Sequence, residues 1–329
     1  MASARRKRRE ELFDIYAANL SKTESGITDT FRCPICLRDF DRTALNLDQA
    51  ITIGHVFPEA IGGRLYTLEC GKCNHNIGTV YDSHRVAEKR YLEWKSGEQG
   101  IKRFVRINYE NNKVPATLSW KEKWLQMRPV EEKEPKYTEY YNNIVSKHQQ
   151  QAKLSFSFDI ETKYNPTNRD KSLIHSALLM MFYCFGYEYI LNPSVGIVRR
   201  VISGIETAYQ PSQMIAYTDI PSIALPAVAV IRKPSDISSF VVIAPADKFM
   251  NKVRAIFLPG LDDLGEERFK HLLELQIPSG TRENIKKVLA STATITNATE
   301  FHLDDETQYG FCEKFWQENA TDFKPATAI

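Results

Sequence analysis

Four cysteines in two Cys-x-x-Cys pairs have the residue types and the spacing of a metal site. The pairs are Cys33-Pro-Ile-Cys36 and Cys70-Gly-Lys-Cys73. Four thiolates suit a closed, tetrahedral zinc site. A redox Cys-x-x-Cys is expected singly and beside a strand-helix-strand pattern, which neither pair shows. The sequence therefore predicts a structural Zn²⁺ bound by Cys33, Cys36, Cys70 and Cys73.

A histidine and an asparagine lie where the two cysteine pairs would bring them together. Thirty-three residues separate Cys36 from Cys70, which is more than a simple zinc ribbon needs, so the excess must be a folded insertion. Within it, His55 lies in an apolar stretch with high β-propensity. Asn74 follows the second pair directly, at the start of a segment expected to become helical. Zinc that fastens both ends of the insertion would bring the strand of His55 against the helix start of Asn74.

A strand, a turn, a strand and a helix that carry these side chains resemble the ββα-metal site of the HNH endonucleases, particularly the zinc-bearing kind. That pattern runs Cys-x-x-Cys, then Glu-His-x-x-Pro with Gly-Gly, then Cys-x-x-Cys-Asn and a nearby glycine. Residues 33 to 82 cover it. Beyond the first pair, the residues at matching places are His55, Pro58, Gly62, Gly63, Cys70, Cys73, Asn74 and Gly78.

The resemblance implies a mechanism of phosphodiester hydrolysis. His55 would be the general base that takes a proton from the attacking water, and its ordinary pKa of about 6.5 suits that task. A single divalent cation, Mg²⁺ or Mn²⁺, would neutralise the charge that grows in the transition state, with Asn74 as a ligand. The zinc would take no part in the chemistry. The cations expected to hold flanking phosphates are Arg64, Lys72, Arg85, Lys89 and Arg90.

The chain departs from the family pattern in two places. Gly54 stands where the family usually has an acid or a histidine that binds the catalytic metal, and glycine offers no side-chain ligand. The family's asparagine that orients the base is also missing, with Thr67 the nearest candidate. The candidate replacements for the metal ligand are Glu59, His75, Asn76, Asp82 and His84. Glu59 follows His55 most closely and is the substitute to test earliest, whereas Asp82 fits a supporting or helix-stabilising role.

Length and composition indicate a soluble globular protein of about two domains. The chain has 329 residues, of which 43% are hydrophobic and 26% charged. We expect an α+β fold, with a small zinc-stabilised ββα-metal (HNH) domain followed by a larger α+β domain that folds by itself from about Lys153. The expected parts are a basic N-terminal helix (1–25), the HNH domain (26–98), a β-hairpin and charged linker (99–150), and the C-terminal α+β domain (151–329).

Periodicity and turn residues place further elements in the second half. An apolar helix over 171–190 is expected to be buried, with His175 as a core histidine and Cys184 as a buried thiol, like Cys312. A hairpin turn is expected at 111–113. The other expected elements are strands at 152–160, 226–233, 238–245, 253–260 and 293–303, and a helix at 266–276.

Charge distribution and the lack of targeting signals limit where the protein is expected to be and what it is expected to bind. No apolar run reaches the roughly 20 residues that cross a bilayer, and the basic N-terminus lacks the apolar core of a signal peptide, so we expect a cytoplasmic protein with no membrane span. The net charge is only +2, but Arg5 to Arg9 form a basic cluster. The cluster either faces phosphates or is a solvated tail.

The leading hypothesis is a metal-dependent HNH endonuclease that hydrolyses phosphodiester bonds in double-stranded DNA. By family analogy, such enzymes often belong to phage defence or mobile elements. The C-terminal domain would supply binding, control or contacts with a regulatory partner or a second copy. The alternative is a catalytically inactive zinc module that binds nucleic acid or protein, which Gly54 favours. A ribonuclease would use the same residue types.

Overall fold

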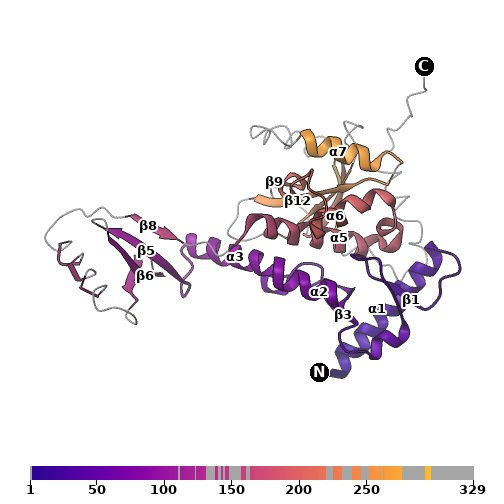
Figure 1. Cartoon of the computed structure of the whole chain (residues 1–329), viewed down its shortest axis with the longest axis horizontal. Helices are drawn as coiled ribbons and strands as arrows, with labels where there is room; N and C mark the ends of the chain where they lie inside the picture. The colour runs from indigo at the N-terminus through magenta and orange to yellow at the C-terminus, as the bar shows by residue number, and fades with distance from the viewer. Residues whose placement is uncertain are drawn as a thin grey trace, which may run out of the picture. The chain divides into compact units, whose positions relative to one another are not determined.

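The computed structural model combines helices with antiparallel sheets and confirms the α+β class. Its contacts divide the chain into two compact units, one of Met1–Ser83 with Asn165–Ile329 and the other of His84–Tyr164 (Figure 1). The residues described are 2–109, 112–122, 124–130, 138–139, 142–143, 145–147, 157–160, 164–219, 225–231, 239–245, 252–261, 263–275 and 293–297.

Helix α1 (Ala2–Thr23) opens the first unit and includes the whole basic cluster. Its apolar face, with Leu12, Tyr16 and Leu20, is buried. The predicted leading helix is therefore confirmed, and it starts earlier than the apolar spacing indicated. The basic residues are part of a regular helix, which gives each of them a defined direction.

Two short hairpins follow α1 and carry the cysteine pairs. Strands β1 (Thr30–Arg32) and β2 (Asp39–Asp41) pair in antiparallel fashion, and the loop between them holds the first pair. Strands β3 (Ile51–His55) and β4 (Tyr66–Cys70) form the second hairpin, which ends at the second pair.

The predicted Gly-Gly turn lies between β3 and β4 and has a steric reason. Gly62 has φ of 94°, a left-handed conformation that favours glycine. A β-carbon on Gly63 would lie 1.8 Å from the backbone oxygen of Phe57, so only glycine fits. Both positions thus need glycine to close this loop.

The helix after the second cysteine pair is continuous but changes its winding. Helix α2 (Gly71–Ile77) leads into a π-helical turn (Gly78–Asp82) and then into α3 (Ser83–Lys95). The Sγ of Cys70 accepts a hydrogen bond from the backbone of Cys73 and caps the helix start. The strand-turn-strand-helix order expected around His55 is present, and the helix begins before Asn74 rather than at it.

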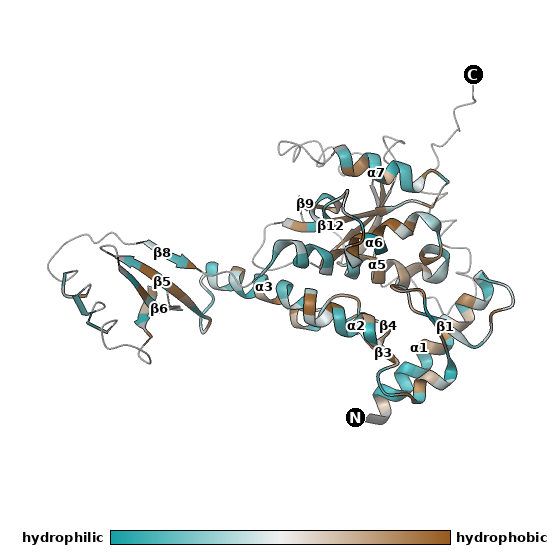
Figure 2. Ribbon diagram, in the orientation of Figure 1, coloured by the Kyte–Doolittle hydropathy of each residue, from teal (hydrophilic) through white to brown (hydrophobic). Residues whose placement is uncertain are grey.

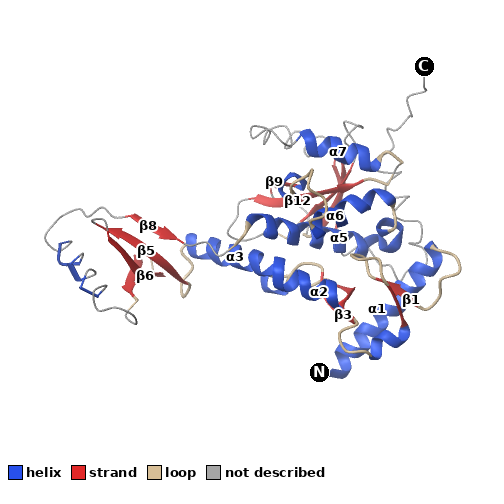
Figure 3. Cartoon of the chain, in the orientation of Figure 1, coloured by secondary structure: helices blue, strands red, loops and turns tan. Residues whose placement is uncertain are grey.

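Helices and a five-stranded antiparallel sheet make up the rest of the first unit (Figure 3). The sheet order is β13-β10-β11-β12-β9, and α5 (Pro166–Ile190) and α7 (Gly265–Leu275) both pack on it. Helix α6 (Gly196–Ser203) packs on α5. The strands are β9 (Ile215–Asp219), β10 (Ala227–Ile231), β11 (Ser239–Ile243), β12 (Lys252–Pro259) and β13 (Ala293–Asn297). The elements predicted at 171–190, 226–233, 238–245, 253–260 and 266–276 are confirmed, as is the described part of 293–303, whereas β9 was not expected.

Helix α5 is largely apolar, and most of its residues are buried. Figure 2 shows the hydropathy of its residues. The helix is long and apolar enough to cross a membrane, but 89% of its most apolar window is buried inside the protein, as in the core helix of a soluble protein. Cys184 on α5 is buried and free, as predicted, and burial raises the pKa of its thiol. Cys312 lies outside the described residues.

One core joins the N-terminal hairpins to α5. The ring of Tyr16 on α1 stacks on Phe182 of α5, with centroids 4.2 Å apart. Near the C-terminal end of α5, the backbone N–H of Tyr187 donates to Asn19.

The boundaries predicted after residues 25, 98 and 150 do not coincide with the two compact units. Whether any predicted part folds by itself stays a prediction, which a truncation tests.

The second unit holds a four-stranded antiparallel sheet in the order β7-β6-β5-β8. Its strands are β5 (Lys102–Tyr109), β6 (Asn112–Lys121), β7 (Trp124–Pro129) and β8 (Ser157–Ile160). Val105, Ile107 and Val114 form its core with Trp94. The strands predicted on either side of the turn at 111–113 are confirmed. Asn112 and Lys113, predicted in the turn, belong to β6 and pair with Tyr109 and Asn108, while 110–111 lie outside the described residues. The charged linker also lies largely outside the described residues, and only 157–160 of the strand predicted at 152–160 is described.

Candidate metal centre and active site

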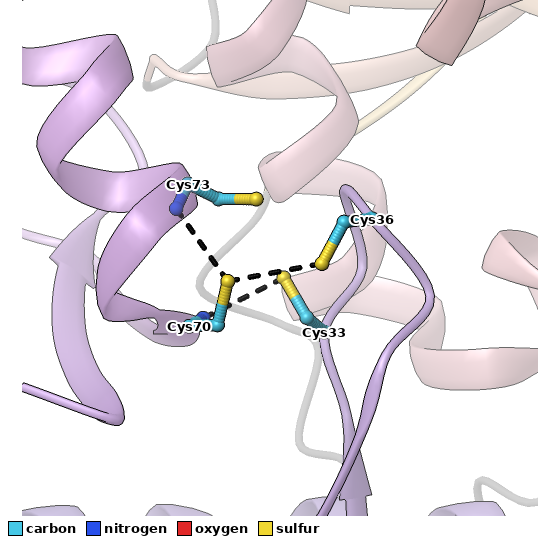
Figure 4. A group of neighbouring side chains, drawn as sticks. All are labelled: Cys33, Cys36, Cys70 and Cys73. Carbon is cyan, nitrogen blue, oxygen red and sulfur yellow. Dashed lines mark hydrogen bonds between the residues drawn. The ribbon is translucent and has the colours of Figure 1, made fainter.

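The four predicted zinc ligands converge in the structure. The Sγ atoms of Cys33, Cys36, Cys70 and Cys73 all lie within 4.8 Å of one another, and their side chains point toward one common centre (Figure 4). Cys33 and Cys70 are buried, whereas Cys36 is exposed. The cluster is positioned to bind a metal ion and is compatible with tetrahedral zinc.

Hydrogen bonds within the cluster favour the thiolate form at Cys36 and Cys70 and the thiol form at Cys33 and Cys73. The Sγ atoms of Cys36 and Cys70 are 3.7 Å apart. Hydrogen bonding from Cys33 lowers the pKa of both thiols, that of Cys70 to about 6. The guanidinium of Arg38 lies 3.4 Å from each of these sulfurs, and the contacts raise its own pKa. Because a thiolate is the form that binds metal, this arrangement suits a metal centre.

Strand pairing sets the surroundings of His55. His55 ends β3 opposite Tyr66 of β4, and the two rings lie 4.7 Å apart. The Nε2 atom of His55 is buried and has no hydrogen-bond partner among the described residues. It lies 3.6 Å from Oε2 of Glu59, which is too long for a hydrogen bond but close enough for an ion or a water to join the two. The predicted base and its earliest substitute ligand are thus neighbours.

Asn74 lies on the first turns of α2 and reaches back to β3. Its Nδ2 donates a hydrogen bond of 2.9 Å to Oγ1 of Thr52. This contact fixes the direction of the amide, so that its oxygen is the atom left for a ligand. The structure therefore brings Asn74 to the β3 strand that carries His55, as the sequence predicted.

An open groove of about 1120 Å³ runs beside these residues. It is lined by Arg5, Arg6, Arg9, Asp48, Gln49, Thr52, Ile53, Glu59, Tyr66 and Asn74. The lining joins three arginines of α1 with Asn74 and with Glu59 and Tyr66, the two residues that contact His55. Arginines of α1 thus supply positive charge to the groove, and its other lining residues include Asn74 and Glu59, the predicted metal ligands.

The arginines of the groove are held in different ways. Arg9 donates to the backbone oxygens of Leu45 and Ile51, which fixes α1 against the start of β3. Arg6 pairs with Glu10. Arg5 is exposed and makes no ion pair within the described part of the chain. Three of the five residues of the basic cluster, Arg5, Arg6 and Arg9, therefore line the groove, whereas Lys7 and Arg8 are exposed and do not line it.

The predicted phosphate contacts lie elsewhere. Arg64 and Lys72 are exposed but are not among the residues that line the groove. Arg85, Lys89 and Arg90 lie on the part of α3 that belongs to the second unit. Arg85 is buried, which does not suit a surface contact with a phosphate, and Lys89 pairs with Glu93 at 3.7 Å.

Two candidate supporting residues have structural partners instead of ligands. Thr67, the nearest candidate to orient the base, is buried and shares a hydrogen bond of 2.8 Å with the hydroxyl of Tyr16. Asp82 accepts a hydrogen bond from Ser172 of α5. Asp82 thus joins the π-helical turn to α5, and its supporting role at the site stays a prediction.

Sequence reasoning missed two features of the site. The first is the groove wall of Arg5, Arg6 and Arg9, whose signal was the spacing of i, i+1 and i+4 on a helix. The second is a buried ion pair between Glu69 of β4 and His175 of α5, with Oε2 and Nε2 2.9 Å apart. A carboxylate inside the otherwise apolar run before Cys70 was its only signal.

Comparison of the chain with protein-family models, with curated proteins and with solved structures finds no match. The resemblance to the HNH endonucleases therefore rests on the sequence motifs named above.

Proposed function

We propose that the protein is a metal-dependent endonuclease that hydrolyses phosphodiester bonds in DNA, with the groove as the substrate site and a structural zinc at the cysteine cluster. The observation that carries the proposal is the groove itself. It places the arginines of α1 beside Asn74 and the neighbours of His55. Arginines that line one groove with the oxygen ligands Asn74 and Glu59 suit the binding and cleavage of a polyanion, and His55, which does not line the groove itself, is next to Glu59 and Tyr66.

The residues present fit the two kinds of metal that this function needs. Within the described residues, the cysteine cluster is the only group of three or more His, Cys, Asp or Glu ligand atoms. A catalytic Mg²⁺ needs less, since it keeps several waters and binds through one or two carboxylates and the substrate phosphate. Glu59 and Asn74, both on the groove, would hold it. When bound, the cation would stabilise the charge on the scissile phosphate.

His55 is suited to act as the base. Its Nε2 has no hydrogen-bond partner within the described chain, and in the tautomer that carries the proton on Nδ1 this nitrogen would accept a proton from the attacking water. The ring is held by Tyr66 and by the strand pairing of β3 with β4. A fixed ring places that nitrogen in one direction, which general-base catalysis requires.

Plasmid cleavage by the purified, zinc-loaded chain in Mg²⁺ and in Mn²⁺ tests the proposal. We expect cleavage that is abolished by EDTA and by His55→Ala. The matched control is His271→Ala, because His271 is an exposed histidine of α7 outside the groove. Cleavage that survives in His55→Ala, or that is lost equally in His271→Ala, would refute the assignment. An RNA substrate in parallel shows which nucleic acid is cut.

The salt dependence of DNA binding tests the groove wall separately. Each lost phosphate contact reduces the slope of log K against log salt by about 0.9 for duplex DNA. We expect Arg5→Ala to reduce the slope by about that amount, whereas Lys22→Ala, at the other end of α1, should leave it unchanged. An unchanged slope in Arg5→Ala would exclude this arginine from phosphate binding.

A non-catalytic zinc module remains the second candidate, and Gly54 is the observation that favours it. No side chain at this position can bind a catalytic metal. This reading predicts DNA binding that depends on the arginines of α1, with no cleavage in either metal. The cleavage assay therefore separates the two candidates directly.

A further inference from the structure

A carboxylate fills the space beside Gly54. A β-carbon built on Gly54 would lie 2.4 Å from Oε1 of Glu69 and 3.3 Å from its Cδ. Real β-carbons do not approach a neighbouring atom so closely. The carboxylate of Glu69 therefore stands where a side chain at position 54 would begin, next to His55 in the sequence.

Glu69 and Asn74 approach the same face of the β3–β4 hairpin. Glu69 pairs directly with Thr52, and Gly54 pairs with Thr67, so these four residues share one face. The hydroxyl of Thr52 is also the atom that receives the hydrogen bond from Asn74. Thr52 thus links the amide of Asn74 to the strand position that carries Glu69.

The carboxylate of Glu69 is held in place by a buried histidine. Its side chain is 1% exposed, that of His175 is 5% exposed, and Oε2 lies 2.9 Å from Nε2. A buried carboxylate is costly unless it is paired. The pair occupies Oε2, while Oε1 is turned toward Gly54. Carboxylates that bind metals are commonly held in this way by a second polar group.

We propose that Glu69 is the carboxylate ligand of the divalent cation in place of the acid that is missing at position 54, and that His175 positions it. The inference rests on the proposed function, which requires the cation. Glu59 is 78% exposed and must be ordered when it binds, whereas Glu69 is already fixed by its partner. Preorganisation therefore favours Glu69 over Glu59 as the principal acidic ligand.

Binding of Mn²⁺ to the zinc-loaded full chain, followed by the electron paramagnetic resonance of free Mn²⁺ without DNA, tests the proposal. Glu69→Gln should weaken binding by about tenfold or more, and Glu59→Gln by less. Asp170→Asn is the matched control, since Asp170 is a buried carboxylate of α5 that pairs with Arg169. Binding by a folded Glu69→Gln at the wild-type affinity would overturn the proposal.

A relocation of the carboxylate tests the same idea in case Glu69→Gln does not fold. Glu69→Ala removes the ligand and empties the space beside Gly54, and Gly54→Asp on that background puts an acid where the family has it. The double variant should recover Mn²⁺ binding relative to Glu69→Ala. A double variant that folds and binds Mn²⁺ no better than Glu69→Ala would overturn the assignment.

Failure of this inference and failure of the proposed function give different results. If the wild type cuts DNA but Mn²⁺ binding is independent of Glu69, only the ligand assignment is wrong. If Mn²⁺ binding depends on Glu69 but no DNA is cut, the endonuclease proposal fails and the metal site stands.

Discussion

Replacement of Gly54 by alanine should destabilise the protein strongly, although it adds only one methyl group. The new β-carbon would lie 2.4 Å from Oε1 of Glu69, and ordinary contact begins at 3.4 Å, so the carboxylate must move by about 1 Å. A rigid carboxylate that moves this far carries Oε2 away from its position 2.9 Å from His175 and beyond hydrogen-bond range.

The size of the loss in the free energy of unfolding follows from the contacts that this shift of the carboxylate would break. Overpacking alone costs about 1–3 kcal/mol. Loss of the hydrogen bond between His175 and the buried carboxylate costs about 1.5–3 kcal/mol. Alanine would otherwise be better than glycine in a strand by roughly 0.5–1 kcal/mol. We therefore expect a loss of about 2–5 kcal/mol in the free energy of unfolding, or a fall in melting temperature of roughly 5–15 °C.

Thermal melting of four zinc-loaded variants measures this effect and its cause. In a Glu69→Ala background the obstructing atoms are gone, so Gly54→Ala should be close to neutral, with a coupling energy of about 2 kcal/mol. Gly78→Ala is the matched control, because Gly78 is in a right-handed helical conformation with nothing within 4 Å of its β-carbon, and it should be neutral or slightly stabilising. A Gly54→Ala loss of the same size in both backgrounds would refute the reasoning.

Four further outcomes are expected. Cys33→Ser should abolish the binding of about one zinc per chain and unfold the first unit, as metal analysis and circular dichroism would show. Acid should release the metal progressively, because protons compete with zinc for the four thiolates, as a zinc dye would report. Asn19→Ala should cost about 1–3 kcal/mol in denaturant unfolding, because it leaves the buried N–H of Tyr187 without its acceptor. A fragment from Lys153 should aggregate rather than fold, contrary to the expectation from sequence, which sedimentation would detect.

Short sequence motifs predicted those parts of the site that are determined by residues close to one another in the sequence. Two cysteine pairs, a Gly-Gly turn and a β-prone stretch with His55 are sufficient to predict a hairpin fastened by metal, and the structure has that hairpin. The strands and the apolar helix of the C-terminal segment were also accessible, since hydrophobic periodicity reports them directly. Each of these features is decided by residues that are close in the sequence.

Features that depend on distant residues could not be predicted in the same way. The sequence left open whether the basic cluster faces phosphates or is a solvated tail, because the partners of Arg9, the backbone oxygens of Leu45 and Ile51, lie about forty residues away. Arg85 looked like a phosphate contact because its spacing on α3 does not show that it is buried. A periodicity argument gives the face of a helix but not what covers that face.

Two helices that are far apart in the sequence, α1 and α5, support strand β4. Tyr16 of α1 holds Thr67, and His175 of α5 holds Glu69, so alternate residues of one strand are fixed by helices more than 100 residues apart. Thr67 in turn pairs with Gly54, the residue before His55. The carboxylate of Glu69 lies beside Gly54 as well, so His175 of α5 supports the neighbour of the proposed base through Glu69. We therefore expect His175→Ala to alter cleavage by the proposed endonuclease, because it frees the carboxylate that packs beside Gly54.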